Sequence, residues 1–558
     1  MMFLGDVKMV RSALVFALLL SAAPAAALPA DFKAKADKML ADAYAADGPG
    51  AAVIVTENGK TVYAAGRGLA DLERKVAITP ATHFRLGSIT KQFTAAAIMK
   101  LAEQGKVSLD DPLSKYVPDY PAANASATVR QLLNHSGGMM SYTNIPGWMV
   151  EAQTGRPYTT GQLIATFKDV APPFKPGAKM DYNNSGYVLL GAILEKVSGK
   201  SWDEAVADLV IAPLKLATIR TGIGAYGTPG MAVGYTSTDS KIGPAQNIHM
   251  SVPHAAGALV GTVGDLAAWG QALHNGKVVT PASYSAMTAS TTTADGKTEA
   301  YGFGLQTGDV RGHKQVGHGG GIFGFSTDSL YLPDDKIFVA VFANSDSPQS
   351  SPGMVARKLA ALAVNDAYPV FAKMPVDPKT LEPAFGVYAF TDVKRTFFSR
   401  DEKLFMQREG GSALEVFSAG KERFFYGPDS LSWFELVTAA AGSRQIAFYP
   451  EGESKAAMAS RTGPPPVATA TVAVPAATLA GYVGSYTSMA GIFVFTQEGD
   501  VLSVKLGAQP AFPLKATSAT EFEIPQVGAR IRFNVKDGKA GSITLFQGGQ
   551  EIEGVRSN

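Results

Sequence analysis

The stretch Phe84-Arg85-Leu86-Gly87-Ser88-Ile89-Thr90-Lys91-Gln92-Phe93-Thr94 sets a serine and a lysine three residues apart, at the start of an apolar run with helical spacing. Positions i and i+3 of a helix share one face, so the Lys91 amine can reach the Ser88 hydroxyl. A desolvated lysine loses its proton more readily, and a neutral amine can accept the proton of a serine that attacks an acyl carbon. The spacing therefore indicates covalent chemistry on Ser88.

The same spacing recurs once, as Ser418-Ala419-Gly420-Lys421, beside glycines and alternating, strand-like residues. We interpret this copy as chance, because the pattern predicts a turn with no helix behind it. After Ser88, in contrast, an apolar stripe follows, formed by Phe93, Ala96, Ala97, Ile98 and Leu101. A serine at a helix start also serves as an N-cap, so the motif alone leaves a purely structural role open.

Length and composition limit the classes of protein to consider. The 558 residues are too many for one ordinary core and suggest about three domains. Hydrophobic residues make up 46% and charged residues 18%, as in globular proteins. The net charge of +2 and the lack of a dense basic stripe argue against a nucleic-acid partner. No cysteine is present, which excludes disulfides, thiolate metal sites and a lipid-modified cysteine.

The N-terminus has the pattern of a secretory signal peptide, residues 1–27. Lys8 and Arg11 precede the apolar run 13–20, and the small residues Ala25-Ala26-Ala27 supply a cleavage site after Ala27. The apolar run is too short for a lasting membrane span, and no later run reaches about 18 residues. We therefore expect a periplasmic or secreted protein without stable membrane insertion.

Residues 31–365 are predicted to form one α/β (α+β) domain. Asn58-Gly59 separates two alternating runs, which is a strong signal of a β-hairpin. A second hairpin is expected from 326–332 and 337–343. Helical spacing is found at 88–104, 129–134, 186–197 and 263–274. Strands at both ends with helices between them predict an antiparallel sheet, assembled from both ends of the domain and covered by helices.

Beyond residue 365 the pattern changes to short alternating strands. Residues 366–380 and 462–478 are predicted linkers. The segments 381–461 and 479–558 repeat a motif, because Leu381, Gly386 and Tyr388 recur with the same spacing as Leu479, Gly484 and Tyr486. Each segment is long enough for a small antiparallel β-barrel that pairs its own edges. We interpret the two barrels as structural appendages, although a ligand site of their own stays open.

A second motif lies within residues 174–187, where Tyr182-Asn183-Asn184 runs directly into an apolar helix. A tyrosine beside a lysine can relay a proton, because the cation favours the phenolate. The Asn184 amide can hydrogen-bond both the lysine and a substrate. A core tyrosine beside an Asn turn is the structural alternative. A rival copy, Tyr142-Thr143-Asn144, has no helix closely after it.

The third motif is Val316-Gly317-His318-Gly319-Gly320-Gly321. A glycine-rich strand lets a substrate lie against the backbone, and its N–H groups can bind an oxyanion. His318 adds a polar or cationic group. Alone, the motif also fits an ordinary glycine-rich turn.

In this order the three motifs resemble the penicillin-recognising serine hydrolase superfamily, which includes class C β-lactamases, D-alanyl-D-alanine carboxypeptidases, D-aminopeptidases and esterases. Two further segments are similar to that family over residues 31–360: Leu132-Leu133-Asn134-His135-Ser136-Gly137, with Gly137 where a serine is usual, and Gly261-Thr262-Val263-Gly264-Asp265-Leu266. The catalytic domain followed by two lipocalin-like barrels resembles the D-aminopeptidase branch.

The resemblance implies a role for each motif residue. Ser88 would be the nucleophile, Lys91 its activating amine and Tyr182 the general acid/base. Asn184, His318 and Gly320 would contact the substrate, and the backbone N–H groups of Ser88 and Gly321 would form the oxyanion hole. The resemblance implies no metal and no organic cofactor. The seven histidines show no convincing ligand spacing.

His318-Gly319-Gly320 stands where class C β-lactamases usually carry Lys-Thr-Gly. Histidine is mostly neutral at pH 7, so attraction for a substrate carboxylate should be weaker than with lysine. We therefore expect hydrolysis of D-amino-acid peptides or related small amides. Alternatives are an esterase of short acyl esters, a class C-like β-lactamase, and a non-catalytic protein that binds peptidoglycan or β-lactams. The acyl group accepted and the oligomeric state are not encoded in any motif.

Overall fold

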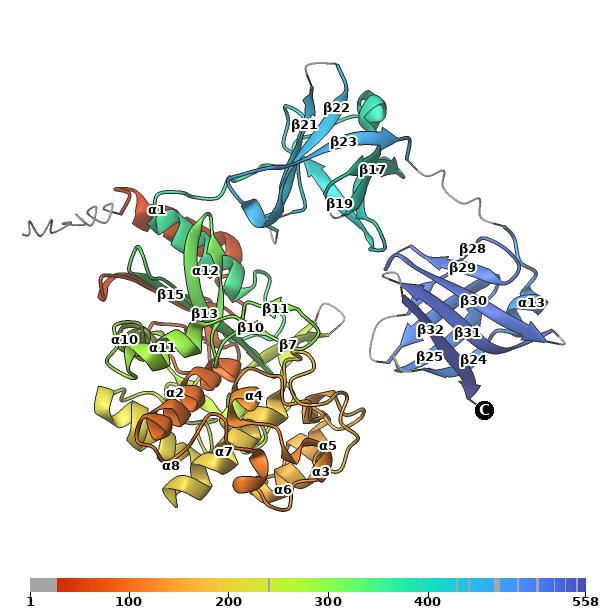
Figure 1. Cartoon of the computed structure of the whole chain (residues 1–558). Coiled ribbons are helices and arrows are strands. Elements are labelled where there is room, and N and C mark those ends of the chain that lie inside the picture. Colours follow the sequence, from red (N-terminus) through yellow and green to blue (C-terminus); the bar gives the residue numbers. More distant parts are fainter. Residues whose placement is uncertain are drawn as a thin grey trace, which may run out of the picture.

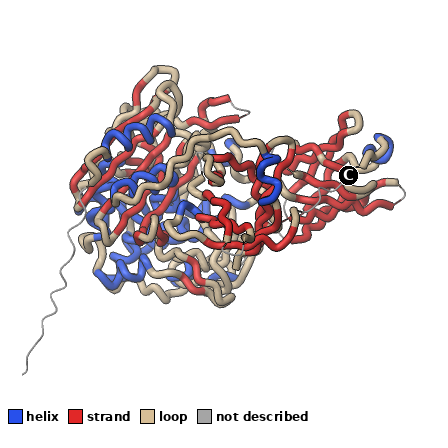
Figure 2. Tube along the Cα trace, turned by 90° about the horizontal axis from the view of Figure 1, so that it is seen from above, coloured by secondary structure: helices blue, strands red, loops and turns tan. Residues whose placement is uncertain are grey.

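A computed structural model describes residues 28–557, except 239–240, 392, 428–429, 440–441, 466–471, 489–490, 508–510, 526, 537 and 548–549. The predicted signal peptide, residues 1–27, lies outside the described residues. The described chain forms an N-terminal domain of helices around a sheet, followed by two bodies of β-strands (Figure 1). Seen from above, nearly all helices lie in the N-terminal domain (Figure 2).

The N-terminal domain is built on a six-stranded antiparallel sheet in the order β12-β13-β14-β15-β1-β2. Its strands are β1 (Ala51–Glu57), β2 (Lys60–Arg67), β12 (Gln306–Val310), β13 (His313–Ile322), β14 (Phe325–Leu332) and β15 (Ile337–Ala343). Asn58 and Gly59 turn the first hairpin with φ of 49° and 76°, the left-handed values of a type I′ turn. Strand β1 pairs with β15, so the sheet joins both ends of the domain, as the sequence predicted.

Both faces of this sheet are covered by helices. Along β1, Ala51, Val53 and Val55 join one core, and Ala52 and Ile54 join the other. The first core lies under α1 (Phe32–Ala43) and α12 (Pro352–Ala363). The second lies under α2 (Thr90–Glu103), α4 (Val129–Leu133), α7 (Asn184–Ser198) and α10 (Val263–His274). A strand that is buried on both faces has a continuous run of apolar residues, and β1 has such a run from Ala51 to Val55.

Helix α2 is the centre of the domain. Residues 90–99 and Leu101 are all buried, so the helix is enclosed on every side rather than along the single stripe read from the sequence. Four of these residues are polar: Thr90, Lys91, Gln92 and Thr94. A helix that buries polar groups requires internal hydrogen-bond partners for each, and the partners of Lys91 form the site described below.

Shorter elements complete the N-terminal domain. They are β3 (Leu69–Asp71), β4 (Val76–Ala77), β5 (Phe84–Arg85), α3 (Ala122–Ala125), α5 (Glu151–Thr154), α6 (Thr160–Ala165), α8 (Trp202–Val206), β6 (Arg220–Thr221), β7 (Tyr235–Thr238), β8 (Lys241–Pro244), α9 (His254–Gly257), β9 (Leu259–Gly261), α11 (Pro281–Thr288), β10 (Thr291–Thr292) and β11 (Thr298–Glu299). None of the helices that the structure describes is both long and apolar enough to cross a membrane.

The first C-terminal body is a closed antiparallel barrel. Its strands are β16 (Gly386–Ala389), β17 (Lys394–Arg400), β18 (Lys403–Arg408), β19 (Ala413–Ser418), β20 (Arg423–Phe425), β21 (Trp433–Thr438), β22 (Arg444–Tyr449) and β23 (Ala457–Gly463). Aromatic side chains fill its interior, with Phe397, Phe424 and Phe434 in mutual contact.

The second body is a nine-stranded sheet whose two ends nearly meet, because its edge strands β27 and β28 are separated only by Leu514. Helix α13 (Ala476–Ala480) precedes it. Its strands are β24 (Gly484–Ser488), β25 (Gly491–Glu498), β26 (Val501–Leu506), β27 (Phe512–Pro513), β28 (Lys515–Ala516), β29 (Glu521–Ile524), β30 (Ala529–Lys536), β31 (Lys539–Gln547) and β32 (Gln550–Ser557). The predicted fold class, an α/β domain followed by two barrels, is confirmed.

The repeated motif makes the same contacts in both barrels. The buried Tyr388 hydroxyl donates to the carbonyl oxygen of Ala384 at 2.6 Å, and the Tyr486 hydroxyl donates to that of Tyr482 at 3.0 Å, each four residues back. A Cβ at Gly386 would lie 2.4 Å from the side chain of Arg461 on the last strand. The repeat therefore encodes how each barrel closes.

Candidate active site

Ser88 and Lys91 meet at the start of α2. Ser88 lies in a 3-10 turn, Gly87–Ile89, and Lys91 in the first turn of the α-helix. The Lys91 Nζ lies 3.1 Å from the Ser88 Oγ. Ser88 is half-buried, whereas Lys91 is completely buried. The structure thus places the lysine beneath a serine that is still open to solvent.

Two further acceptors hold the Lys91 amine. Its Nζ lies 2.8 Å from the Asn184 Oδ1 and 2.9 Å from the carbonyl oxygen of Ala256. A neutral amine has two protons and one lone pair, and both of these oxygens can only accept. Its two protons therefore go to Asn184 and Ala256, and its lone pair is left facing the Ser88 hydroxyl. This geometry suits a base that removes the Ser88 proton.

The electrostatics of the site also favour a neutral amine. Burial lowers the pKa of Lys91 well below its ordinary value, because the charged form loses its hydration. No carboxylate is within ion-pairing distance of Lys91 among the described residues. Its Nζ does lie 4.7 Å from the ring centroid of Tyr182, a contact that partly supports the charged form once Lys91 accepts a proton.

Asn184 is the first residue of α7, and its amide orientation is fixed. Its Nδ2 donates to the Thr143 Oγ1 at 3.2 Å, which leaves Oδ1 directed at Lys91. Asn183 caps the helix, since its Oδ1 accepts from the Gly186 N–H at 3.0 Å. Thr143 belongs to the second Tyr-x-Asn segment, residues 142–144. That segment therefore contributes Thr143 to the site, while the asparagine that contacts Lys91 is Asn184.

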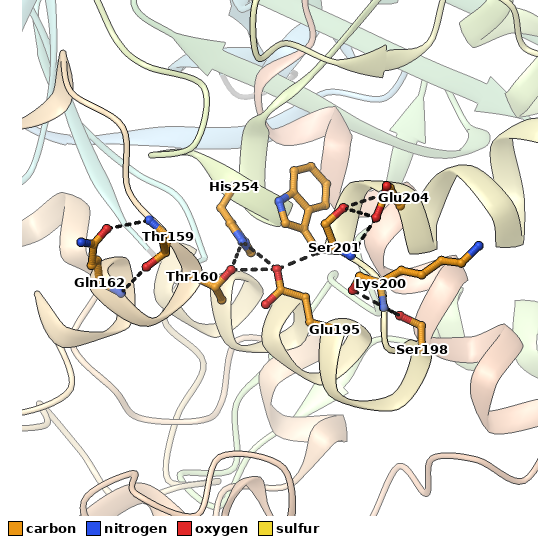
Figure 3. A network of polar contacts seen from close by, with 10 residues as sticks. Thr159, Thr160, Gln162, Glu195, Ser198, Lys200, Ser201, Glu204 and His254 are labelled. Atoms are coloured by element: carbon orange, nitrogen blue, oxygen red, sulfur yellow. Dashed lines mark hydrogen bonds and ion pairs between the residues drawn. The ribbon is translucent and has the colours of Figure 1, made fainter.

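The carbonyl of Ala256 is delivered by the short helix α9, which a polar network anchors (Figure 3). The Thr160 hydroxyl donates to Glu195 Oε1 at 2.7 Å, and its oxygen lies 3.1 Å from His254 Nε2. Since the Thr160 proton goes to the carboxylate, His254 Nε2 must be the donor to Thr160. Burial lowers the pKa of His254 to about 3, so the histidine is neutral and holds α9 in place through its hydrogen bond to Thr160.

Tyr182 lies in the loop just before α7, with its ring over Lys91. Its hydroxyl is buried and has no well-formed hydrogen bond among the described residues. Burial raises the pKa of Tyr182, and the Ser88 hydroxyl opposes this effect only in part. In the resting site burial favours the neutral form of both groups, and the role of Tyr182 as general acid/base stays a prediction. Tyr182 is a neutral phenol that can donate a proton.

Strand β13 runs along Ser88. A Cβ at Gly320 would lie 2.1 Å from the carbonyl oxygen of Leu86 and 3.1 Å from the backbone nitrogen of Ser88. Only glycine allows this approach. The next residue, Gly321, is exposed, and a Cβ there would meet nothing within 4 Å. The backbone of Gly321 is thus beside Ser88 and accessible to a ligand.

His318 lies on β13 but does not offer a charge to the site. Its Nδ1 lies 2.5 Å from the carbonyl oxygen of Gly319, which can only accept, so Nδ1 carries the proton. Its Nε2 then accepts from the Tyr301 hydroxyl at 3.0 Å. Burial, together with nearby Lys91, lowers the pKa of His318 to about 3. His318 is a neutral ring whose two nitrogens are both occupied.

The sequence did not reveal Tyr301, Thr143, Ala256 or His254 as members of this site. Ala256 contributes only a backbone carbonyl, which has no residue-type signature. Tyr301 precedes β12 and reaches His318 across the domain interior. Among the residues that the structure describes, the second Ser-x-x-Lys copy has no comparable surroundings: Ser418 ends β19, and its Oγ accepts from the Gly420 N–H at 3.1 Å.

Comparison with known proteins identifies this arrangement. Residues 36–363, more than half of the chain, match the family described as Beta-lactamase. The chain belongs to the beta-lactamase family. It is accordingly a serine hydrolase of the β-lactamase and penicillin-binding protein type. The match contains the six-stranded sheet and every site residue above.

Three similar proteins extend this result. "Penicillin-binding protein 4*" of Bacillus subtilis (strain 168) is 24% identical over 73% of this chain and 94% of its own. A "D-aminopeptidase" of Gluconobacter oxydans (strain 621H) is 26% identical over 75% of this chain and 74% of its own. The solved structure of a D-stereospecific amidohydrolase from Streptomyces sp. is 27% identical, with a TM-score of 0.50, over 59% of this chain and 98% of its own.

Proposed function

We propose that this hydrolase cleaves amide bonds of D-amino-acid peptides or related small amides through an acyl-enzyme on Ser88. One observation carries the chemistry: both protons of a neutral Lys91 amine are taken by Asn184 and Ala256, and its lone pair faces Ser88 at 3.1 Å. An activated serine of this kind needs no separate imidazole base. Burial keeps the amine neutral and thus ready to accept a proton.

The steps follow from the contacts. The Ser88 oxygen attacks the carbonyl carbon while its proton passes to Lys91, and the oxyanion binds the backbone N–H groups of Ser88 and Gly321. The C–N bond then breaks, and the neutral phenol of Tyr182 gives its proton to the leaving amine. Tyr182 regains a proton from the Lys91 ammonium beneath its ring. Water attacks the acyl-enzyme by the same route in reverse and releases the acid.

The third motif supports the choice of substrate class. His318 is neutral, its Nδ1 proton is held by Gly319, and its Nε2 is occupied by Tyr301. It therefore lacks the fixed positive charge that attracts the carboxylate of a β-lactam or of a peptide C-terminus. Two similar proteins are named a D-aminopeptidase and a D-stereospecific amidohydrolase, which supports a D-configured substrate for this chain. Short acyl esters are the second candidate, because the same uncharged site accepts them.

The proposed location is the periplasm or the exterior. The N-terminal charges, the apolar run 13–20 and the small residues before position 28 support export. Cell fractionation with an antibody, together with the N-terminal sequence of the secreted form, tests this point. A cytosolic protein that begins at Met1 would contradict it.

The test of function uses four chromogenic substrates: the anilides of D-alanine and of L-alanine, a short-chain nitrophenyl ester and a cephalosporin. Ser88→Ala should abolish all turnover, whereas the matched change Ser418→Ala should leave it unchanged. A D-anilide preferred over its L-isomer supports the proposal, and a preference for the ester or the cephalosporin selects that alternative. Equal loss in both variants, or no turnover by the folded protein, would contradict the proposed nucleophile or the enzymatic role.

A further inference from the structure

His135 lies just after helix α4, within the segment 132–137 that is similar to the family. Its backbone has a φ of 62°, a left-handed value that is uncommon for residues other than glycine. The residue is only 1% exposed. An unfavourable backbone conformation persists where the surrounding contacts enforce it. The contacts of His135 therefore indicate its role.

His135 binds the backbone on both sides of Tyr182. Its carbonyl oxygen accepts from the Asp181 N–H at 3.0 Å. Its side-chain Nδ1 accepts from the Asn183 N–H at 3.1 Å. One buried residue thus holds the residue before Tyr182 and the residue after it.

The hydrogen bond from Asn183 requires a neutral His135 ring, because only an unprotonated Nδ1 can accept. Burial, together with the nearby Lys91 and His318, lowers the pKa of His135 well below its ordinary value. With Nδ1 as the acceptor, the single ring proton is on Nε2. His135 therefore keeps its contact with Asn183 at neutral pH.

The ring of His135 also supports the ring of Tyr182. The two ring centroids lie 4.3 Å apart, with the planes tilted by 44°. Tyr187 and Tyr301 contact the same histidine ring, with centroids at 5.2 and 4.7 Å. The Tyr187 hydroxyl donates to the carbonyl oxygen of Leu133 at 2.9 Å, which ties α7 to the end of α4. A change in the His135 ring would therefore alter the position of Tyr182.

The Tyr182 hydroxyl depends on this support for its position. Residues 171–183 form neither helix nor strand, and the hydroxyl has no well-formed hydrogen bond among the described residues. A general acid must come within about 2.6–3.2 Å of the atom that it protonates. A misplacement of about 1 Å can lower a rate about 10²-fold. The contacts behind Tyr182 therefore matter directly for proton transfer.

From these contacts we propose that His135 is a positioning residue, which holds the Tyr182 phenol where it can give its proton to the leaving group. The inference rests on the proposed function, in which Tyr182 is the general acid. As the bond to the acyl carbon breaks, the phenol proton passes to the leaving atom, and the Lys91 ammonium returns a proton to Tyr182. An alkoxide or amide anion is a poor leaving group and needs that proton, whereas a nitrophenolate leaves without it. Loss of His135 should therefore slow poor leaving groups selectively.

The test compares kcat/KM of the full chain for the ethyl ester and the nitrophenyl ester of one short-chain acid. The acyl group is shared, so the ethyl/nitrophenyl ratio isolates the leaving group. In Tyr182→Phe this ratio should fall about 10²–10⁴-fold, which is the usual contribution of a general acid. In His135→Gly it should fall at least about tenfold through misplacement of the phenol. Glycine keeps the left-handed backbone but lacks the ring and the acceptor.

His135→Asn is the conservative variant. Asparagine also adopts left-handed φ values, and its Oδ1 stands where Nδ1 does, so it can accept from the Asn183 N–H. This variant should recover more than half of the glycine loss on a logarithmic scale. If His135→Gly does not fold in thermal unfolding, His135→Leu, which fills the space without an acceptor, takes its place.

His254→Asn is the matched control. His254 is also a buried histidine with a left-handed φ, 47°, but it holds α9 and the Ala256 carbonyl that binds Lys91 (Figure 3). Lys91 serves both esters, so His254→Asn should lower the two kcat/KM values together and keep their ratio.

The outcomes separate this inference from the proposed function. An unchanged ratio in His135→Gly beside a lowered ratio in Tyr182→Phe overturns the role of His135 alone. Equal ratios in the His135→Gly and His135→Asn variants, or an equal fall in His254→Asn, also overturn it. A wild type that cleaves only the nitrophenyl ester, or an unchanged ratio in Tyr182→Phe, contradicts the acid role of Tyr182 and removes both.

Discussion

Replacing Tyr301 with phenylalanine tests whether the neutrality of His318 decides which substrates are accepted. The change removes one hydroxyl, which donates to His318 Nε2 at 3.0 Å, and keeps the ring that packs beside His135 and Tyr182. The Nδ1 proton of His318 is still donated to the Gly319 carbonyl oxygen. The variant therefore leaves a buried lone pair without a donor and a histidine that accepts a proton more readily.

The size of the effect follows from that lost hydrogen bond. An unsatisfied buried acceptor costs about 1–3 kcal/mol, and 1.36 kcal/mol corresponds to one pH unit. The pKa of His318, about 3 in the wild type, should thus rise by about one to two pH units. At pH 5 the charged fraction then increases from about 1% to about 10% or more. A cation at this position attracts a substrate carboxylate.

The assay compares kcat/KM for a cephalosporin, which carries a carboxylate, with kcat/KM for an uncharged nitrophenyl ester. The ratio of the two cancels the titration of Lys91, which both substrates share. Between pH 8 and pH 5 this ratio should rise in Tyr301→Phe by up to about tenfold more than in the wild type, in proportion to the charged fractions of His318. The expected change lies in KM of the cephalosporin, since the chemical groups at Ser88 are unaltered.

Tyr284→Phe is the matched control. The Tyr284 hydroxyl lies 2.6 Å from Nδ1 of His274, another buried histidine whose pKa burial lowers to about 3, but neither residue contacts Ser88 or Lys91. This variant should lose comparable stability and keep a constant substrate ratio. A pH-independent ratio in Tyr301→Phe, or the same change in both variants, would refute the role assigned to Tyr301.

Three further predictions concern the base, the glycine strand and the barrels. Lys91→Met should lower the acylation rate about 10²–10⁴-fold. In the wild type the acylation rate should rise with pH through a midpoint below about 10.4, the ordinary pKa of lysine, because burial lowers the pKa of Lys91 and only the neutral amine is a base. A midpoint above that value in stopped-flow measurements would exclude Lys91 as the base. Gly320→Ala should lower the free energy of unfolding by at least about 1–3 kcal/mol through overpacking, seen as a lower Tm. Gly321→Ala should keep the Tm of the wild type, because its Cβ would meet no atom within 4 Å. Tyr388→Phe should destabilise the first barrel by about 1 kcal/mol and leave kcat of ester hydrolysis unchanged, whereas a loss of kcat would show that the barrel acts on the site.

Local patterns predicted the parts of the site that depend on neighbours in sequence. Ser88 and Lys91 are three residues apart at a helix start, and the structure brings their polar atoms to 3.1 Å. Asn184 was predicted because it opens an apolar helix, and it reaches Lys91 across a sequence separation of 93. The hairpin at Asn58-Gly59 was predicted because only a few residue types adopt its left-handed turn.

The sequence could not predict contacts that depend on backbone atoms or on distant packing. The Ala256 carbonyl reaches Lys91 from 165 residues away, and any residue offers the same oxygen. Tyr301 bridges to the first residue of β12, which in turn pairs with Gly317 beside His318, but the strand pattern does not indicate which side chains then touch. The sequence indicated that Tyr182 lies near Lys91, but it did not show that both groups are buried, which favours their neutral forms.

The titratable groups around Ser88 share one property, which is that burial drives each of them to its uncharged form. Lys91, His135 and His318 have lowered pKa values, and Tyr182 has a raised one. Lys91 also lowers the pKa of both histidines, so a proton placed on Lys91 makes it the single cation of a neutral shell. In the proposed mechanism that cation forms only when Ser88 attacks, at the same moment as the oxyanion. The attraction between the two charges is therefore absent in the ground state and present in the transition state, which is the condition for an electrostatic contribution to catalysis.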